Sequence, residues 1–171
     1  MSLYKTIAKQ ASVEQTIEKS RFIGHICPVE SREEAEAFIA AIRARYKDAT
    51  HNVPAMVLGD QFQIQWASDD GEPQGTSGAP MVQMLTAQGV TNVALVVTRY
   101  FGGIKLGPGG LVRAYTGTAR LALEEAGIVE VKEREFFLVE FAYPYLDKLQ
   151  YLAAQGSFSL EDLTYAELVG G

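Results

Sequence analysis

Cysteine is nearly absent from this chain: Cys27 is the one example among 171 residues, so no internal disulfide framework can stabilise the fold. No run approaches the roughly 20 apolar residues that a membrane-spanning helix needs, and the start, MSLYKTIAKQ, lacks the apolar core of a secretory signal. His25 and His51 lie far apart in the sequence, which argues against a structural zinc site. These absences predict a cytoplasmic protein with no membrane segment, no metal and no other cofactor.

Acidic residues are missing from one long segment. Residues 73–123 contain no Asp or Glu but four cations, Arg99, Lys105, Arg113 and Arg120. The whole chain carries a formal charge of −6, so this segment at +4 leaves −10 for the rest. The sequence therefore predicts an acidic protein with one basic region, and such a region favours contact with polyanions.

The hydropathy pattern predicts a globular α+β fold. Hydrophobic content of 47 % and charged content of 21 % are enough to build a core without disulfides or metals. Apolar spacing and turn residues predict two or three antiparallel strands within 4–29, a helix from the Ser31–Glu34 capping box to Lys47, hairpin strands at 53–58 and 62–67, a helix at 81–88, a strand at 93–97, a helix at 111–126, a strand at 128–141 and a helix at 144–154. This order predicts an α+β sandwich with its helices on one face.

The stretch Thr98 to Tyr115, TRYFGGIKLGPGGLVRAY, joins a predicted strand to a predicted helix. Glycines at such a junction let the backbone approach a ligand closely, and the free amides of a helix start favour anions. The spacing is not that of a P-loop, and a tight connection that binds no ligand remains an alternative. The predicted nucleic-acid or anion-binding residues are Arg99, Tyr100, Gly102, Gly103, Lys105, Gly107, Gly109, Gly110 and Arg113.

A second group of candidate residues lies upstream. Asp69, Asp70 and Glu72 surround Gly71, and such a cluster can hold a hard cation, supply a general base or form a solvated turn. It can also pair with the basic segment, which would weaken the anion-site hypothesis. No nucleophile-elbow motif is present, so no catalytic residue is predicted. The possible additional site comprises Lys19, Arg21, His51, Asp69, Asp70 and Glu72.

These segments resemble the signature of the Impact family, whose bacterial members are called YigZ-like. The likeness rests on the residues from Arg99 to Tyr115, on KSRF from Lys19, on THN from Thr50, and on SDDGEPQGTSGAP from Ser68. It implies a two-layer sandwich similar to the module shared by a small-subunit ribosomal protein, elongation factor G domain four and the sugar and mevalonate kinases. Residues 1–132 are expected to form the Impact N-terminal-type domain, and residues 133–171 the incomplete start of a small ferredoxin-like domain.

The resemblance also implies a role in translation regulation, because the eukaryotic members act through a ribosome-associated activator of a starvation-response kinase. We predict a non-catalytic binding protein that meets RNA or the ribosome through its basic, glycine-rich face, without DNA specificity. An enzyme acting on a phosphorylated small substrate, with Asp70 or Glu72 as base or metal ligand, is one alternative. An interaction module for an acidic protein partner is the other. An open basic surface favours binding, whereas a pocket that unites the acidic and basic loops favours the enzyme.

Overall fold

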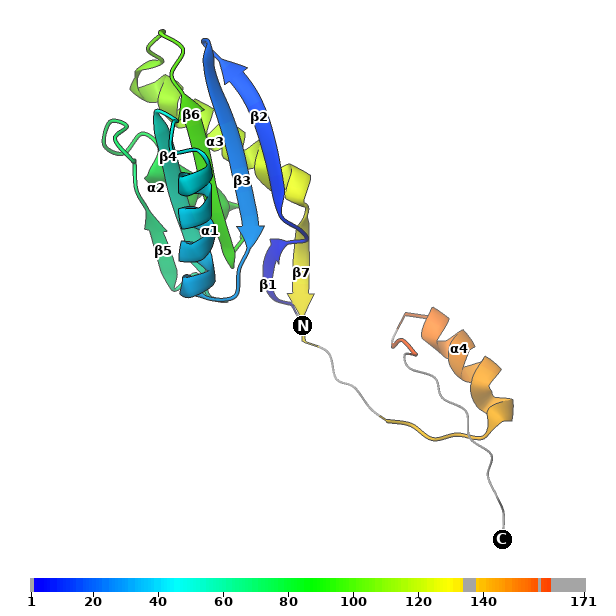
Figure 1. Cartoon of the computed structure of the whole chain (residues 1–171). Helices are drawn as coiled ribbons and strands as arrows, with labels where there is room; N and C mark the ends of the chain where they lie inside the picture. The colour runs from blue at the N-terminus through cyan, green and yellow to red at the C-terminus, as the bar shows by residue number, and fades with distance from the viewer. Residues whose placement is uncertain (1, 134–137, 157, 161–171) are drawn as a thin grey trace. The chain divides into compact units, whose positions relative to one another are not determined.

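The computed structural model describes residues 2–133, 138–156 and 158–160, and the chain divides into two units, residues 1–133 and 134–171. The first unit contains a five-stranded antiparallel sheet of order β2-β3-β6-β4-β5 and a two-stranded antiparallel sheet of β1 and β7 (Figure 1). Its elements are β1 (Ser2–Ile7), β2 (Ala11–Ile17), β3 (Ser20–Pro28), α1 (Arg32–Arg45), β4 (His51–Leu58), β5 (Ile64–Ala67), α2 (Gly78–Ala87), β6 (Val93–Tyr100), α3 (Gly107–Ala126) and β7 (Ile128–Lys132).

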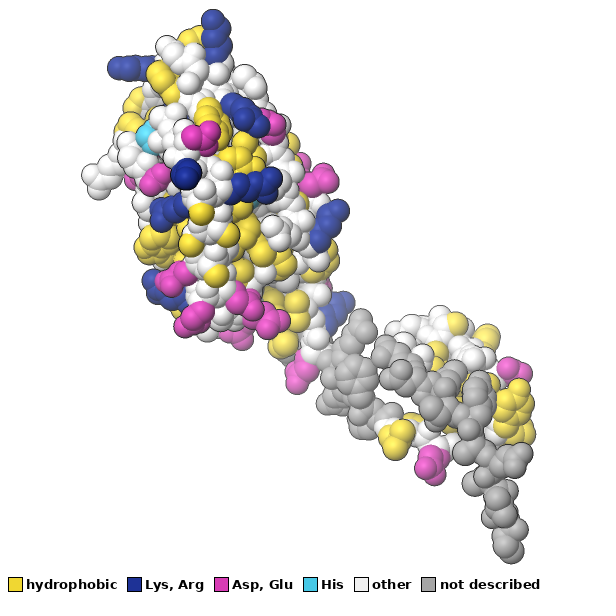
Figure 2. Space-filling view, in the orientation of Figure 1, with side chains coloured by type: hydrophobic (Ala, Val, Ile, Leu, Met, Phe, Trp, Pro, Cys, Tyr) yellow, Lys and Arg dark blue, Asp and Glu magenta, His cyan; other side chains and the backbone are white. Residues whose placement is uncertain are grey.

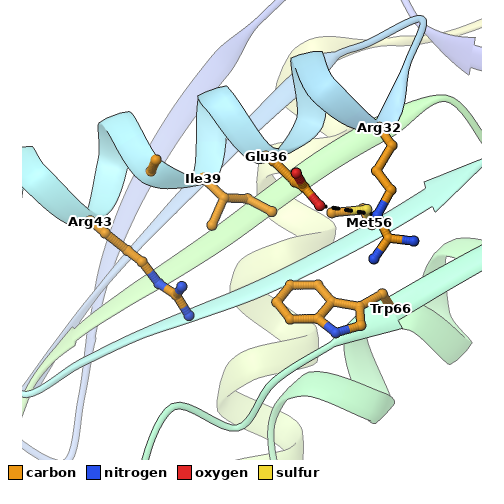
Figure 3. Close-up of a pocket in the computed structure, with 7 residues that line it drawn as sticks. Arg32, Glu36, Ile39, Arg43, Met56 and Trp66 are labelled. Carbon is orange, nitrogen blue, oxygen red and sulfur yellow. Dashed lines mark hydrogen bonds and ion pairs between the residues drawn. The ribbon is translucent and has the colours of Figure 1, made fainter.

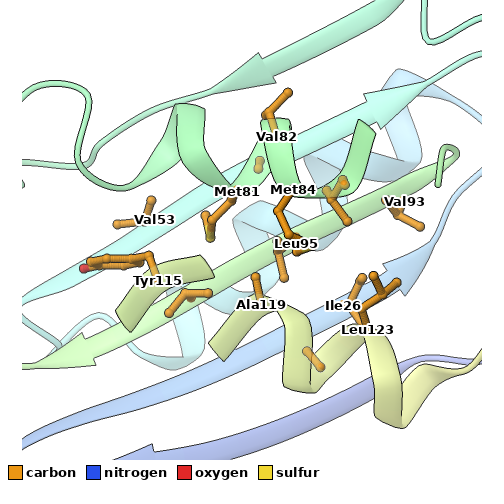
Figure 4. Close-up of a cluster of buried hydrophobic side chains, with 14 of the residues drawn as sticks. Ile26, Val53, Met81, Val82, Met84, Val93, Leu95, Tyr115, Ala119 and Leu123 are labelled. Carbon is orange, nitrogen blue, oxygen red and sulfur yellow. The ribbon is translucent and has the colours of Figure 1, made fainter. Parts of the chain in front are cut away.

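Helices cover both faces of the five-stranded sheet, so the prediction of a two-layer sandwich with helices on one face is wrong. In β6, Val93, Leu95 and Val97 pack in the cluster under α2 and α3 (Figure 4), and Ala94 and Val96 pack in a second cluster under α1. Figure 1 shows the same arrangement, with α1 on one side and α2 and α3 on the other. The unbroken apolar run of β6 follows from this double cover, because a strand buried on both faces has no polar side.

Capping residues set the helix ends largely as the sequence predicts. The Ser31 hydroxyl accepts a hydrogen bond from the Glu34 amide at 3.1 Å to begin α1, and Gly127 ends α3 with a φ of 78°. The starts of α2 and α3, at Gly78 and Gly107, lie three and four residues earlier than predicted. In the described ranges, no helix is both long and apolar enough to cross a membrane.

The strand at the end of the first unit is shorter than predicted, and the helix of the second unit lies close to its predicted place. Strand β7 ends at Lys132 and the described residues 138–142 have no regular structure, so the predicted strand over 128–141 is too long; residues 134–137 lie outside the described residues. A short 3₁₀ turn, η1 (Tyr143–Tyr145), leads into α4 (Leu146–Ala154), close to the predicted helix. The ferredoxin-like assignment of this unit stays a prediction.

A buried network of polar side chains connects the three central strands, β3, β6 and β4. Thr98 on β6 donates to Asn52 Oδ1 on β4 at 2.7 Å, and its oxygen lies 3.3 Å from His25 Nε2 on β3. Because the Thr98 proton is already used, His25 Nε2 must be the donor to Thr98, and Nδ1 lies 3.1 Å from the Ser12 hydroxyl, which can donate to it when the ring is neutral. Burial, aided by the nearby charge of Arg45, lowers the pKa of His25 to about 4.

We expect acid to destabilise the protein through His25. Its folded-state pKa of about 4 lies below the unfolded value of 6.5, so unfolding takes up a proton between these pH values. The stabilisation is complete above pH 6.5 and is lost as pH falls toward 4, a change of about 3 kcal/mol in the free energy of unfolding. Denaturant titrations at pH 7 and pH 4.5 should show a smaller difference for His25→Gln than for the unmodified chain. An equal difference in both proteins would contradict this assignment.

Candidate functional site

Three strand ends meet at one end of the five-stranded sheet. Strand β3 begins at Ser20, β4 begins at His51 and β6 ends at Tyr100. The antiparallel register places His51 opposite Arg99 and Arg21 opposite Tyr100. Two loops lie against this end: residues 68–77, which carry the acidic cluster, and residues 101–106, which lead into α3. Motifs from four distant parts of the sequence are thereby brought together.

Glu72 is the centre of the interior part of this site. Its side chain is 2 % exposed, and one carboxylate oxygen, Oε1, faces three donors. Arg99 Nη1 lies at 2.6 Å, the Tyr115 hydroxyl at 2.9 Å and His51 Nε2 at 3.1 Å. Burial and the adjacent carboxylate raise the pKa of Tyr115 above its ordinary range. We call these four residues the Glu72 cluster; they join α3, β4 and β6 to the acidic loop.

Arg99 is enclosed rather than presented to solvent. Its side chain is 6 % exposed, and its Nε and Nη2 atoms donate to the Ser20 hydroxyl oxygen at 3.3 and 3.2 Å. The guanidinium carbon also lies 5.5 Å from the centre of the Phe22 ring and 5.3 Å from that of Phe101. With Nε, Nη1 and Nη2 each donating a hydrogen bond and two aromatic rings near its guanidinium, Arg99 is placed to hold the fold together. The sequence prediction put it among the anion ligands, and its burial does not fit that role.

His51 connects the Glu72 cluster to Asp70. Its Nδ1 lies 2.7 Å from the Asp70 carbonyl oxygen, which can only accept, so Nδ1 carries a proton. Its Nε2 faces the Glu72 carboxylate, another acceptor. The Asp70 carboxylate in turn accepts a hydrogen bond from the backbone amide of Asn52 at 2.7 Å.

Asp69 closes the acidic loop onto the start of α2. Its carboxylate accepts from the backbone amides of Gly75, Ser77 and Gly78 at 2.8, 3.2 and 2.9 Å. Partial burial opposes ionisation of Asp69, but these three hydrogen bonds outweigh it and lower its pKa. All three acids of the loop therefore have structural partners. Among the residues that the structure describes, no group of three His, Cys, Asp or Glu side chains is placed to hold a metal ion.

The exterior part of the site is basic and carries an aromatic ring. Phe101 is 46 % exposed, and Lys19, Lys105 and Arg113 are exposed as well. The Arg113 side chain lies close to the start of α3: a Cβ placed on Gly109 would be 3.2 Å from Arg113 Nη1. No side chain caps this helix start, whose N-cap is Leu106. We define the basic tip as Lys19, residues 101–110 and Arg113. In Figure 2, dark blue side chains project at this end of the first unit.

Two other predicted ligands are partly engaged by the protein itself. Arg21 forms an ion pair with Glu14 and lies 5.4 Å above the Tyr100 ring. The Tyr100 hydroxyl donates to Asp48 at 2.9 Å, so Phe101 is the more available of the two aromatic residues. The sequence reasoning did not select Ser20 or Tyr115 as site residues, although both lie in the motifs that it singled out.

Gly102 is required by close packing. Its amide donates to the Ser20 hydroxyl oxygen at 3.2 Å, and a Cβ at this position would overlap the carbonyl group of Lys19. The turn between β2 and β3 therefore lies directly against the glycine-rich loop. Gly103 has a φ of 92° with open space around it, which is a conformational requirement rather than a packing one.

Comparisons with known proteins identify the family. The model of the Impact N-terminal domain matches residues 18–123. The Impact family member YvyE of Bacillus subtilis is 42 % identical over 97 % of this chain and 76 % of its own length, and YigZ of Escherichia coli is 45 % identical over 69 % of this chain and 59 % of its own. A crystal structure described as that of a hypothetical protein matches 97 % of this chain and 82 % of its own, with a TM-score of 0.72 and 34 % identity. The chain belongs to the Impact family.

Proposed function

We propose that this protein acts in translation regulation as a non-catalytic binding protein that contacts RNA or the ribosome through the basic tip. Membership of the Impact family supports the general role, since the family resemblance implies translational control. The choice of surface rests on the charges. The basic tip carries Lys19, Lys105 and Arg113 in exposed positions.

The inward orientation of the acidic loop is the observation that carries the proposal. Asp69 binds backbone amides at the start of α2, and Glu72 binds Arg99 in the interior. The carboxylates of Asp69 and Glu72 are thus used inside the protein, and residues 73–123, which include the exposed Lys105 and Arg113, contain no Asp or Glu. A positive surface of this kind attracts phosphates over several ångströms.

Phe101 gives the basic tip a second means of contact with nucleic acid. Its ring is exposed, and one face of it lies 5.3 Å from the Arg99 guanidinium, which fixes its position. Aromatic side chains held among cations stack on unpaired bases with little sequence preference. The proposed ligand is therefore a single-stranded or looped segment of RNA, free or as part of the ribosome.

The enzyme alternative is disfavoured by the same contacts. A general base or metal ligand must have a free oxygen that a substrate can reach, whereas Glu72 is buried and its Oε1 already faces three donors. One cavity is lined by α1, β4 and β5, and another by Ser68 and Asp69 of the acidic loop with β5 and α2; neither of these two includes a residue of the glycine-rich loop, so neither unites the acidic and basic loops. An acidic protein partner at the basic tip remains the alternative that a binding experiment distinguishes.

Titration of a labelled single-stranded RNA at one low salt concentration tests the proposal. We expect saturable binding, and we expect Lys105→Ala to weaken it about two- to fivefold irrespective of base sequence, because one exposed ion pair contributes up to about 1 kcal/mol. Lys5→Ala is the matched control: Lys5 is also exposed but lies on β1 in the two-stranded sheet. If both variants lose RNA affinity equally, or if no saturable binding is seen, the RNA proposal is wrong. The alternative of an acidic protein partner then takes its place.

A further inference from the structure

A groove lies between α1 and the edge strand β5, separate from the basic tip. It has a volume of about 430 Å³. Its floor is apolar, formed by Ile39, Ala40 and Met56, and Trp66 of β5 forms its outer wall (Figure 3). Trp66 is 38 % exposed, although it is a large aromatic side chain on the sheet edge. A partly exposed aromatic ring beside an apolar floor offers a ligand an apolar surface to pack against.

The backbone of β5 is open along the same groove. Strand β5 is the last strand of its sheet and pairs only with β4. The Ser68 amide donates to the Pro54 carbonyl oxygen at 3.2 Å, and backbone hydrogen bonds alternate along an antiparallel strand. Trp66 and Ile64 therefore face β4 with their backbone groups, and Gln65 and Ala67 direct theirs away from the sheet. An added strand would find donors and acceptors there.

Two arginines make the two ends of the groove positive. Figure 3 shows Arg32 and Arg43 projecting from α1 on either side of Ile39, toward the side of the groove where Trp66 lies. Arg32 is paired with Glu36 at 3.0 Å, whereas Arg43 lies 3.8 Å from Asp70 Oδ1, too far for a hydrogen bond. Both arginine side chains are at least 41 % exposed. Glu36 and Asp70 lie beside the two arginines, but the distance from Arg43 to Asp70 is too long for a hydrogen bond, so the exposed Arg43 guanidinium is able to donate to a carboxylate of an acidic ligand.

We propose that β5 and this groove bind an extended acidic peptide segment of a partner protein by strand addition. The peptide pairs with the backbone of Gln65 and Ala67, packs an apolar side chain against the exposed ring of Trp66, and directs a carboxylate on the same face to Arg43. Side chains on one face of a strand recur at every second residue, so the recognised pattern has acidic and apolar residues two positions apart. This site is independent of the proposed RNA contact.

Trp66 provides the readout, because it is the one tryptophan of the chain. The probe is a seven-residue peptide with blocked ends. It has glutamate at positions 1 and 7, valine at positions 3 and 5, and threonine at positions 2, 4 and 6. We expect a saturable change in Trp66 fluorescence. The same peptide with lysine in place of glutamate should bind at least tenfold more weakly. Equal binding of the two peptides would overturn the acidic preference and with it the proposal.

N-methylation tests strand addition itself. Successive amides of an added strand point alternately toward β5 and toward solvent, so methylating one alternate set should abolish binding and methylating the other should preserve it. Arg43→Gln should weaken binding of the glutamate peptide about fivefold or more, and Arg120→Gln, which removes an exposed cation of α3, should not. Equal effects of the two methylated sets, or a fluorescence change that depends on protein concentration alone, would overturn the proposal.

Discussion

Replacing Glu72 with alanine is expected to lower the free energy of unfolding by about 3–5 kcal/mol, because Arg99 is left buried without its carboxylate. The Glu72 side chain is 2 % exposed and the Arg99 side chain 6 %, so solvent cannot replace the lost partner. His51 and Tyr115 lose the same acceptor. Denaturant titration measures the change directly.

The matched control for this prediction is Glu36→Ala. Glu36 also pairs with an arginine, Arg32, but both side chains are at least half exposed, and such pairs contribute at most about 1 kcal/mol. Adding Arg99→Met to Glu72→Ala should recover part of the lost stability, because no buried charge then remains unpaired. If Glu72→Ala costs no more than Glu36→Ala, the Glu72 cluster does not hold this end of the sheet together.

Gly102→Ala is expected to destabilise the protein by about 2 kcal/mol or more, because the new Cβ would overlap backbone atoms of Lys19 rather than a flexible side chain. Relief requires the β2–β3 turn and the glycine-rich loop to separate. That movement would also stretch the hydrogen bond from Gly102 to Ser20, the residue to which Arg99 donates.

Gly117→Ala provides the contrast. Gly117 lies inside α3, and a Cβ there would have Gln15 Nε2 as its nearest neighbour, at 3.9 Å, an ordinary contact. Alanine favours the helix over glycine, so this variant should be more stable by about 0.5–1 kcal/mol. Thermal unfolding of both variants gives the comparison. If Gly102→Ala has the same melting temperature as the unmodified chain, the β2–β3 turn and the glycine-rich loop are not tightly packed.

The sequence predicted local structure better than it predicted layers. The Ser31–Glu34 capping box and Gly127 marked helix ends, because both signals act within a few residues. The number of layers depends instead on which apolar residues face each helix. The clearest available signal was β6, where Val93 to Val97 is apolar at every position, as expected of a strand covered on both faces.

The sequence analysis named residues that the structure brings together at one end of the sheet, but it did not predict which of them are buried and which are exposed. Charge counting identified the basic segment, and the sequence analysis recognised that the acidic loop could pair with it. It did not show that Arg99 would be the cation enclosed, because its partner Glu72 lies 27 residues away in the sequence and meets it only through the packing of three strands. Periodicity alone could not separate Arg99, at the end of a buried strand, from Lys105 and Arg113 outside it.

The salt dependence of RNA binding tests the central claim most directly. If Lys19, Lys105 and Arg113 each neutralise one phosphate of a single strand, log K should fall with log salt with a slope of about −2, from roughly −0.7 per contact. Lys105→Ala should flatten this slope by about 0.7. Saturable binding with these slopes would support the basic tip as the RNA-binding surface. A slope that Lys105→Ala leaves unchanged, or no binding even at low salt, would contradict it.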